Sequence, residues 1–446
     1  MDRMISAFFK QKFILHDISP DILKIFLSAS VLVVFSFCLQ GNILTDLADE
    51  GFLWYGTLRT ALGDIPLHDF QSYDPGRYYW TAAWSEIFGT SLMALRMSVA
   101  VFQALGLTLG MMALRRIIHS WQTLLIAGTL LLVWMHPRHK VFEHSLTMAA
   151  VYVAVLLIEK PSFRRHFATG MFVGTAAFFG RNHGFYGFIS FFLLILFIWL
   201  KNQRTDFIRR TALYGTGVLA GYSPMLIMFI LIPGFFQSFI ENIQFILRNS
   251  TNLSLPVPWP WTADFIHINM TETVKFVSTG IFFLMLPVFY ILAGAYLIRS
   301  KIDISKQKPL MTASVFVGVP YIHHIFSRAD ISHLAQGIHP LLIGLLSLSF
   351  IYRNPPRSVR TDPPRSVRID KSEPPAGFGN PAGAGMGNPP RSVRIDKSEP
   401  PAGFVNPAGA GMGNPPRSVR IDKSEPPAGF GNPAGAGMGN PPRSVR

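Results

Sequence analysis

The chain has 446 residues, of which 49% are hydrophobic and only 15% are charged, and its formal net charge is +15. So small a charged fraction excludes an ordinary soluble protein, and the basic residues are scattered in short clusters rather than one stripe, which argues against nucleic acid as a partner. The single cysteine, Cys38, excludes a disulfide framework.

The composition changes abruptly at Asn354. Before this residue long apolar runs recur along the chain, and after it no apolar run exceeds a few residues. Long apolar runs separated by short polar segments are typical of membrane-spanning helices. We therefore predict an all-α, polytopic transmembrane bundle over 1–353 and a separate tail over 354–446.

About ten membrane spans are predicted in the first part, and four of them are shorter than the roughly 17 residues that a helix needs to cross the hydrocarbon. These four are expected to be re-entrant segments or helices extended by polar ends. The predicted spans lie at 22–40, 92–114, 121–135, 145–158, 167–180, 185–200, 212–235, 275–298, 309–326 and 336–352.

Basic residues cluster in every second connection between these spans, as the positive-inside rule expects of cytoplasmic loops. Together with a basic N-terminus they predict that both ends of the span series lie in the cytoplasm and that the segment at about 41–91 faces outward. The clusters are Arg115 and Arg116; Lys160, Arg164 and Arg165; Lys201, Arg204, Arg209 and Arg210; and Arg299, Lys301, Lys306 and Lys308.

The outward segments hold the residues that can carry chemistry. Asp49 and Glu50 form a carboxylate pair at the predicted membrane boundary, where a carboxylate can deprotonate an acceptor hydroxyl. The simpler alternative is a solvated charge at a helix start. Arginine suits a phosphate because its planar fork binds two oxygens at once. The outward arginines and the histidines near them are Arg77, Arg138, Arg181, His183, Arg328 and His333.

Three elements follow one another in the first outward segment: the Asp49-Glu50 pair, the turn Gly63-Asp-Ile-Pro-Leu-His-Asp-Phe70 and Tyr73-Asp-Pro-Gly76. Over about 45–95 this order resembles the first extracytoplasmic loop of the GT-C superfamily of polytopic glycosyltransferases, and more closely that of bacterial relatives of protein O-mannosyltransferases. The segments that begin at Arg181 and Arg328 are similar to later outer loops of such enzymes.

This resemblance implies a sugar donor carried on a polyprenyl phosphate and transfer with inversion to a hydroxyl of a glycan, lipid or protein acceptor. It implies a multi-pass protein of the bacterial inner membrane whose site faces the periplasm or exterior. The base is expected to be Asp49, assisted by Glu50. The donor phosphate is expected to contact Arg181, Arg328, Arg77, His183 and His333, and the substrate loop to contain Asp69 and Asp74.

Several expectations stay open at this level. Asp69 either contacts substrate or caps a helix that begins near Phe70, and Arg77 either binds phosphate or reaches to lipid headgroups. No histidine spacing is diagnostic of a metal site, and no cofactor is implied beyond a divalent cation, whose participation is left open.

The tail departs from the family, whose members continue with further spans or a soluble domain. Its unit starts at Asn388 and again at Asn414, which gives a period of 26 residues rich in proline and glycine. Such a unit offers no apolar face and is predicted to be disordered. Two other functions remain: a transporter or lipid flippase, and a truncated, non-catalytic remnant.

Overall fold

The computed structural model describes residues 20–43, 47–202, 206–249, 255–263, 265, 269–299 and 308–353. Within these ranges every regular element is a helix, apart from an isolated bridge between Pro66 and Phe70. The all-α, multi-pass class predicted from the sequence is therefore confirmed. The tail at 354–446 and the basic N-terminus lie outside the described residues.

The helices of the first half, in chain order, are α2 (Pro20–Gln40), α3 (Leu47–Ala61), α4 (Pro75–Phe88), α5 (Leu92–Arg115), α6 (Trp121–Val133), the 3₁₀ turn η2 (Arg138–Lys140), α7 (Val141–Glu159) and α8 (Phe163–Phe179). Those of the second half are α9 (Arg181–Asn202), α10 (Phe207–Gly221), α11 (Ser223–Leu231), α12 (Phe235–Asn249), η4 (Pro260–Thr262), α13 (Met270–Arg299), α15 (Pro309–Ser327), α16 (Ile331–Gly337) and α17 (His339–Arg353).

Six of the described helices are long and apolar enough to cross a membrane, or up to eight spans result if each of two bent helix pairs counts as one. The bent pairs are α10 with α11, at 54°, and α16 with α17, at 59°. The expectation of about ten spans is thus too high. α6 has only 13 residues, or about 20 Å of helix against about 30 Å of hydrocarbon. α8 carries Arg164 and Arg165 in its first turn.

Glycine lets α8 and α10 approach until their backbones touch. A Cβ at Gly170 or Gly174 of α8 would overlap the carbonyls of Tyr214 and Val218, and one at Gly217 would overlap the carbonyl of Phe167. Small residues spaced four apart are the usual means by which membrane helices pack closely, because van der Waals contact replaces the hydrophobic effect inside lipid. α8 also packs against α7 and α9.

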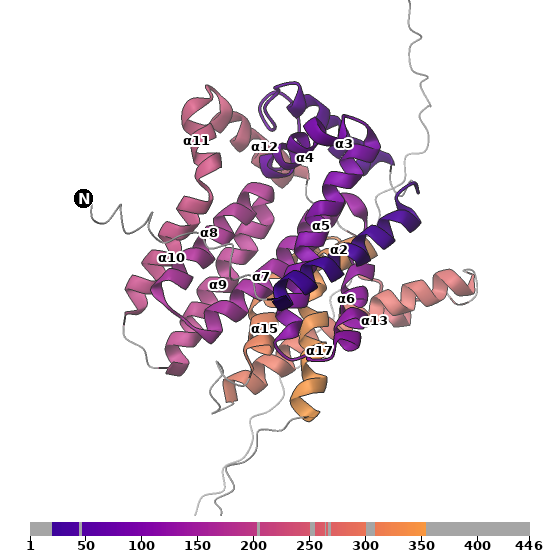
Figure 1. Ribbon diagram of the computed structural model, residues 1–446, viewed down its shortest axis with the longest axis vertical. Coiled ribbons are helices and arrows are strands. Elements are labelled where there is room, and N and C mark those ends of the chain that lie inside the picture. Colours follow the sequence, from indigo (N-terminus) through magenta and orange to yellow (C-terminus); the bar gives the residue numbers. More distant parts are fainter. Residues whose placement is uncertain are drawn as a thin grey trace, which may run out of the picture. The chain divides into compact units, whose positions relative to one another are not determined.

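The two ends of the bundle differ in chemistry. At one end, Arg116 lies 3.4 Å from Glu159, Lys201 donates to the carbonyl of Ile298 at 2.7 Å, and Arg210 donates to the carbonyl of Pro161. These contacts gather the basic clusters of the predicted cytoplasmic side. The opposite end carries α3, α4, α11 and α12 (Figure 1).

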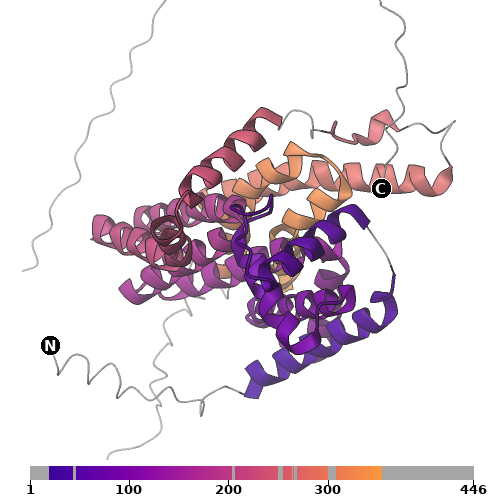
Figure 2. The ribbon, with the colours of Figure 1, turned by 90° about the horizontal axis from the view of Figure 1, so that it is seen from above.

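α2 lies at the margin of the bundle, where it packs on α5 and α6 (Figure 2). Its inner residues Ile25, Ala29 and Val33 are buried, whereas Val31 and Phe35 are 67% and 64% exposed. An outward apolar face on a long apolar helix is the face that lipid covers. α2 is therefore a boundary between the bundle and the bilayer.

Candidate functional site

The first outward segment folds into two helices joined by a tight turn. Asp49 and Glu50 lie in the first turn of α3, where the helix dipole favours negative charge. Consecutive side chains of a helix point about 100° apart, so Asp49 and Glu50 face different surroundings. Glu50 is buried at 3% exposure, and the Asp49 side chain is 47% exposed.

Three consecutive residues of η2 hold this segment in place. Arg138 donates to Oε1 of Glu50 at 3.1 Å, Nε2 of His139 lies 3.1 Å from Oδ2 of Asp49, and Lys140 donates to the hydroxyl of Tyr73 at 3.0 Å. The basic turn η2 is thus bound to acidic and aromatic residues of the segment that begins with α3.

Glu50 is fixed from a second side by Arg96 of α5. Nε and Nη2 of Arg96 donate to its two carboxylate oxygens, and Nη1 donates to the carbonyl of Gly41 at 2.7 Å. Burial opposes the ionisation of Glu50, but the two arginines outweigh it and keep its pKa below the usual value. The carboxylate is charged and held at both oxygens.

Asp49 is the accessible member of the pair. The hydrogen bond with His139 is the largest cause that lowers its pKa; partial burial works against it, and the charges of Lys140 and Arg328 add to the lowering, which leaves the pKa at about 2. At neutral pH the group is a carboxylate. It lies in the field of cations contributed by η2 and by the segment after α15, almost two hundred residues further along the chain.

Arg77 is enclosed in the interior. Its side chain is 4% exposed, its Nη1 lies 3.0 Å from Oε1 of Glu143, and its Nε donates to the carbonyl of Phe179 at 3.0 Å. The guanidinium also lies 4.8 Å from the ring centre of Tyr73. It joins α4, α7 and the end of α8 at the base of the outward segment.

Arg181 is bound to Asp74, which directly precedes α4. Its Nε and its backbone N–H donate to the two oxygens of Asp74 at 2.9 and 2.8 Å, and its Nη2 donates to Oδ1 of Asn242 in α12 at 2.9 Å. The remaining nitrogen, Nη1, is buried and has no hydrogen-bond partner. The beginnings of α4 and α9 are thus tied together, with α12 attached to them.

The segment between α15 and α16 carries Arg328, a cation that is partly exposed. Nε of Arg328 lies 3.0 Å from Oδ2 of Asp330, and its side chain is 43% exposed. Asp330 accepts from the backbone N–H of His333 at 2.8 Å and so caps α16, and it also contacts Nδ1 of that histidine. His183 is buried, with Nδ1 2.7 Å from the hydroxyl of Tyr321.

Asp69 closes the turn between α3 and α4. Its Oδ2 accepts from the backbone N–H of Ile65 at 2.7 Å and its Oδ1 lies 2.7 Å from Nδ1 of His68. α4 begins at Pro75, after Asp74, so the alternative in which Asp69 caps a helix near Phe70 is wrong. The Gly-x-x-Pro element bends the chain back before that helix can start.

Six of the predicted site residues fall into three groups, and the first group also contains Lys140, which was not among the predicted residues. Asp49, Lys140 and Arg328 share one electrostatic environment. Glu50 and Arg77 form the second group, each in a buried ion pair. The Arg181–Asp74 pair forms a third group beside α12.

Analysis of the sequence missed two groups that matter, Lys140 and Arg96. Lys140 lies in a loop that was predicted to face outward, where basic residues are disfavoured. Arg96 lies within an apolar run, where an ionised side chain is costly unless it is paired. In the described part of the chain, no group of three or more histidine, cysteine, aspartate or glutamate side chains is placed to hold a metal ion.

Comparison with known proteins returned one distant likeness. No model of a protein family matches the sequence, and no curated protein matches it. Among solved structures, the chain is similar to ArnT from Cupriavidus metallidurans, determined bound to undecaprenyl phosphate, with a TM-score of 0.42 and 16% sequence identity. The similarity covers 75% of this chain and 61% of that one, so the chain spans less than two thirds of the length of ArnT.

Proposed function

We propose that this protein is a membrane glycosyltransferase that moves a sugar from a polyprenyl-phosphate donor to an acceptor hydroxyl on the extracytoplasmic face, with inversion. The observation that carries the proposal is the position of Asp49. It is an accessible, ionised carboxylate that faces cations from two segments distant in sequence, Lys140 and Arg328. The likeness of segment 45–95 to the first outer loop of GT-C enzymes supports the same function.

In this reaction the acceptor oxygen bonds to the anomeric carbon, and the bond from that carbon to the donor phosphate breaks. The electron pair of the broken bond leaves with the polyprenyl phosphate, and the acceptor proton passes to Asp49. A carboxyl group with a pKa of about 2 is fully ionised but is a weak base. Proton transfer therefore comes late, once the acceptor oxygen has begun to bond to carbon and has become acidic.

The leaving phosphate needs cations that are free to meet it. Arg328 is exposed enough to do so and retains most of its N–H groups, and Lys140 offers an ammonium beside Tyr73. We assign the donor phosphate to these two, with His333 oriented by Asp330 next to them. A divalent cation is not needed in this scheme.

The other predicted residues receive supporting roles. Arg77 and Glu50 are held in buried ion pairs, and His183 is bonded to Tyr321. Arg77 and Glu50 therefore position the segments that carry Asp49 and Lys140, and His183 joins α9 to α15. Arg181 joins Asp74 to Asn242, and its Nη1 is buried with no hydrogen-bond partner in the described part of the chain.

The test is release of polyprenyl phosphate from a panel of short-chain polyprenyl-phosphate hexoses and pentoses, with the purified full-length protein in detergent and a hydroxyl acceptor. Asp49→Asn keeps the shape of the side chain and removes the proton acceptor, so the rate should fall by about 10²-fold or more while donor binding persists. Asp64→Asn is the control, because Asp64 pairs with Arg59 in the same segment.

Arg328→Ala should weaken donor binding and slow transfer together. Arg328→Lys should keep only part of the donor affinity and of the rate, since lysine lacks the planar fork. Near-wild-type turnover in a folded Asp49→Asn protein removes Asp49 as the base. The proposed function is overturned if the folded wild-type protein releases polyprenyl phosphate from none of the donors in the panel.

A further inference from the structure

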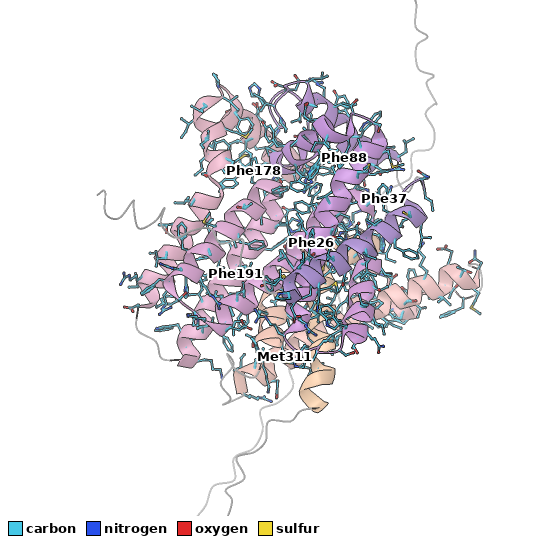
Figure 3. The ribbon with its side chains drawn as sticks, viewed as in Figure 1. Phe26, Phe37, Phe88, Phe178, Phe191 and Met311 are labelled. Carbon is cyan, nitrogen blue, oxygen red and sulfur yellow. The ribbon has the colours of Figure 1, made fainter. Side chains whose placement is uncertain are left out.

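Two cavities adjoin along the contact between α2 and α5, outside the group around Asp49. The first is an apolar groove of about 430 Å³, and the second is a polar cavity of about 250 Å³ at the outward end of α2. Phe37 and Ala100 line both, so the two spaces share a wall. Figure 3 shows Phe26 and Phe37 along α2 with Phe88 of α4 beside them; all three line the groove.

The groove faces the bilayer. It is lined almost wholly by apolar side chains, which include Val34 and Leu105 at 60% and 41% exposure. α2 forms one of its walls and is the helix with the least buried span. A hydrocarbon chain that enters from the membrane fits such a groove, since it needs no polar partner there.

The polar cavity carries a net positive charge. Arg96 and Arg138 line it, and Glu50 is the one carboxylate that the described contacts place against them. Burial lowers the pKa of His136, another lining residue, so that imidazole adds no charge at neutral pH. One positive charge is left uncompensated, and a neutral headgroup does not balance it.

The described contacts of the two arginines use only some of their N–H groups. A guanidinium has five N–H groups. Arg138 uses one to Glu50 and one to the carbonyl of Gln40, and Arg96 uses two to Glu50 and one to the carbonyl of Gly41. The amide of Gln103 lines the same cavity. A phosphate that is brought there meets several donors at once.

We propose that these adjoining cavities bind one anionic phospholipid of the outer leaflet, with its phosphate in the polar cavity against Arg138 and Gln103 and one acyl chain in the groove along Phe26 and Phe37. The lipid lies next to Glu50 and so steadies the arginines that hold the start of α3. This site is separate from the donor phosphate site, and it stands whether or not the protein transfers sugar.

The test uses the purified full-length protein in nanodiscs of phosphatidylcholine that contain increasing fractions of phosphatidylglycerol, with lipid retention read by native mass spectrometry and stability read by thermal unfolding. We expect phosphatidylglycerol to be retained and to raise the midpoint temperature. Gln103→Glu puts a negative charge in the cavity and should lower the affinity by about tenfold or more. Gln103→Lys should preserve it or raise it, which separates a charge effect from a folding defect.

Val101→Trp tests the groove, which Val101 lines. It should displace the lipid, whereas Ile126→Trp on the exposed face of α6 should not. Equal retention of phosphatidylcholine and phosphatidylglycerol by the wild-type protein overturns the proposal. So does a Gln103→Glu variant that binds phosphatidylglycerol as tightly as Gln103→Lys does.

Discussion

Glu50 and Arg96 meet in a two-pronged ion pair: Nε and Nη2 of the arginine lie 2.8 and 2.6 Å from the two carboxylate oxygens. Both side chains are about 5% exposed or less. The pair joins the first turn of α3, which also carries Asp49, to the N-terminal part of α5.

Glu50→Gln should therefore act on stability before it acts on chemistry. The amide keeps the size of the side chain but leaves Arg96 and Arg138 without a compensating charge, and breaking a buried pair on one side typically costs about 3–5 kcal/mol. Unfolding in detergent, followed by heat, measures the loss. Asp64→Asn breaks a pair with Arg59 whose side chains are about one-third exposed, and because solvent screens this pair the loss of stability should be much smaller than for Glu50→Gln. Equal stability of the two variants would contradict a structural role for Glu50.

The pH dependence of Asp49 follows from its low pKa. The folded pKa of about 2 lies below the ordinary 3.8, so the stability that ionised Asp49 contributes is fully present above about pH 4 and is lost as the pH falls from there through about 2. The midpoint temperatures of the wild type and of Asp49→Asn should differ by a constant amount from pH 7 to pH 5 and converge on further acidification. A difference that already shrinks between pH 7 and pH 5 would show that another group is responsible.

Removal of the charge should cost much more stability at Arg77 than at Arg328. Arg77→Met leaves Glu143 buried and unpaired, with an expected cost of about 3–5 kcal/mol. The double change Arg77→Met with Glu143→Leu should recover most of that stability. Arg328→Met affects an exposed side chain and should change stability by less than about 1 kcal/mol. Thermal unfolding of the four proteins checks this, and a double variant less stable than Arg77→Met alone would contradict it.

The glycine contact between α8 and α10 predicts a position-specific effect. Gly217→Leu drives a side chain into the backbone of α8 and should lower the yield of folded protein and the midpoint temperature, since overpacking costs about 1–3 kcal/mol or more. Gly215 lies on the same helix with open space around its Cβ position. Gly215→Leu should be neutral or stabilising, because leucine forms helix more readily than glycine. Similar losses in both variants would mean that α10 rejects leucine for another reason.

The sequence alone determined the class of the molecule. Apolar runs of membrane length are a local property, and each predicted span coincides with a helix or a bent helix pair. The distribution of basic clusters also predicted which connections share an end of the bundle, because charge at loop positions is visible without any knowledge of packing. The number of crossings was not determined in this way, since it depends on where a helix such as α10 ends and bends at Tyr222.

The burial and the partners of the candidate site residues were decided by the tertiary structure. Asp49 and Glu50 look equivalent in the sequence, yet one is buried between two arginines and the other is accessible, because neighbouring helical side chains face different surroundings. In the sequence alone, Arg77 and Arg181 have no visible carboxylate partner and were interpreted as cations of the outward segments. Their carboxylate partners, Glu143 and Asp74, are 66 and 107 positions away. A pairing over such separations depends on how α4, α7 and α9 pack, which no local pattern of residues records.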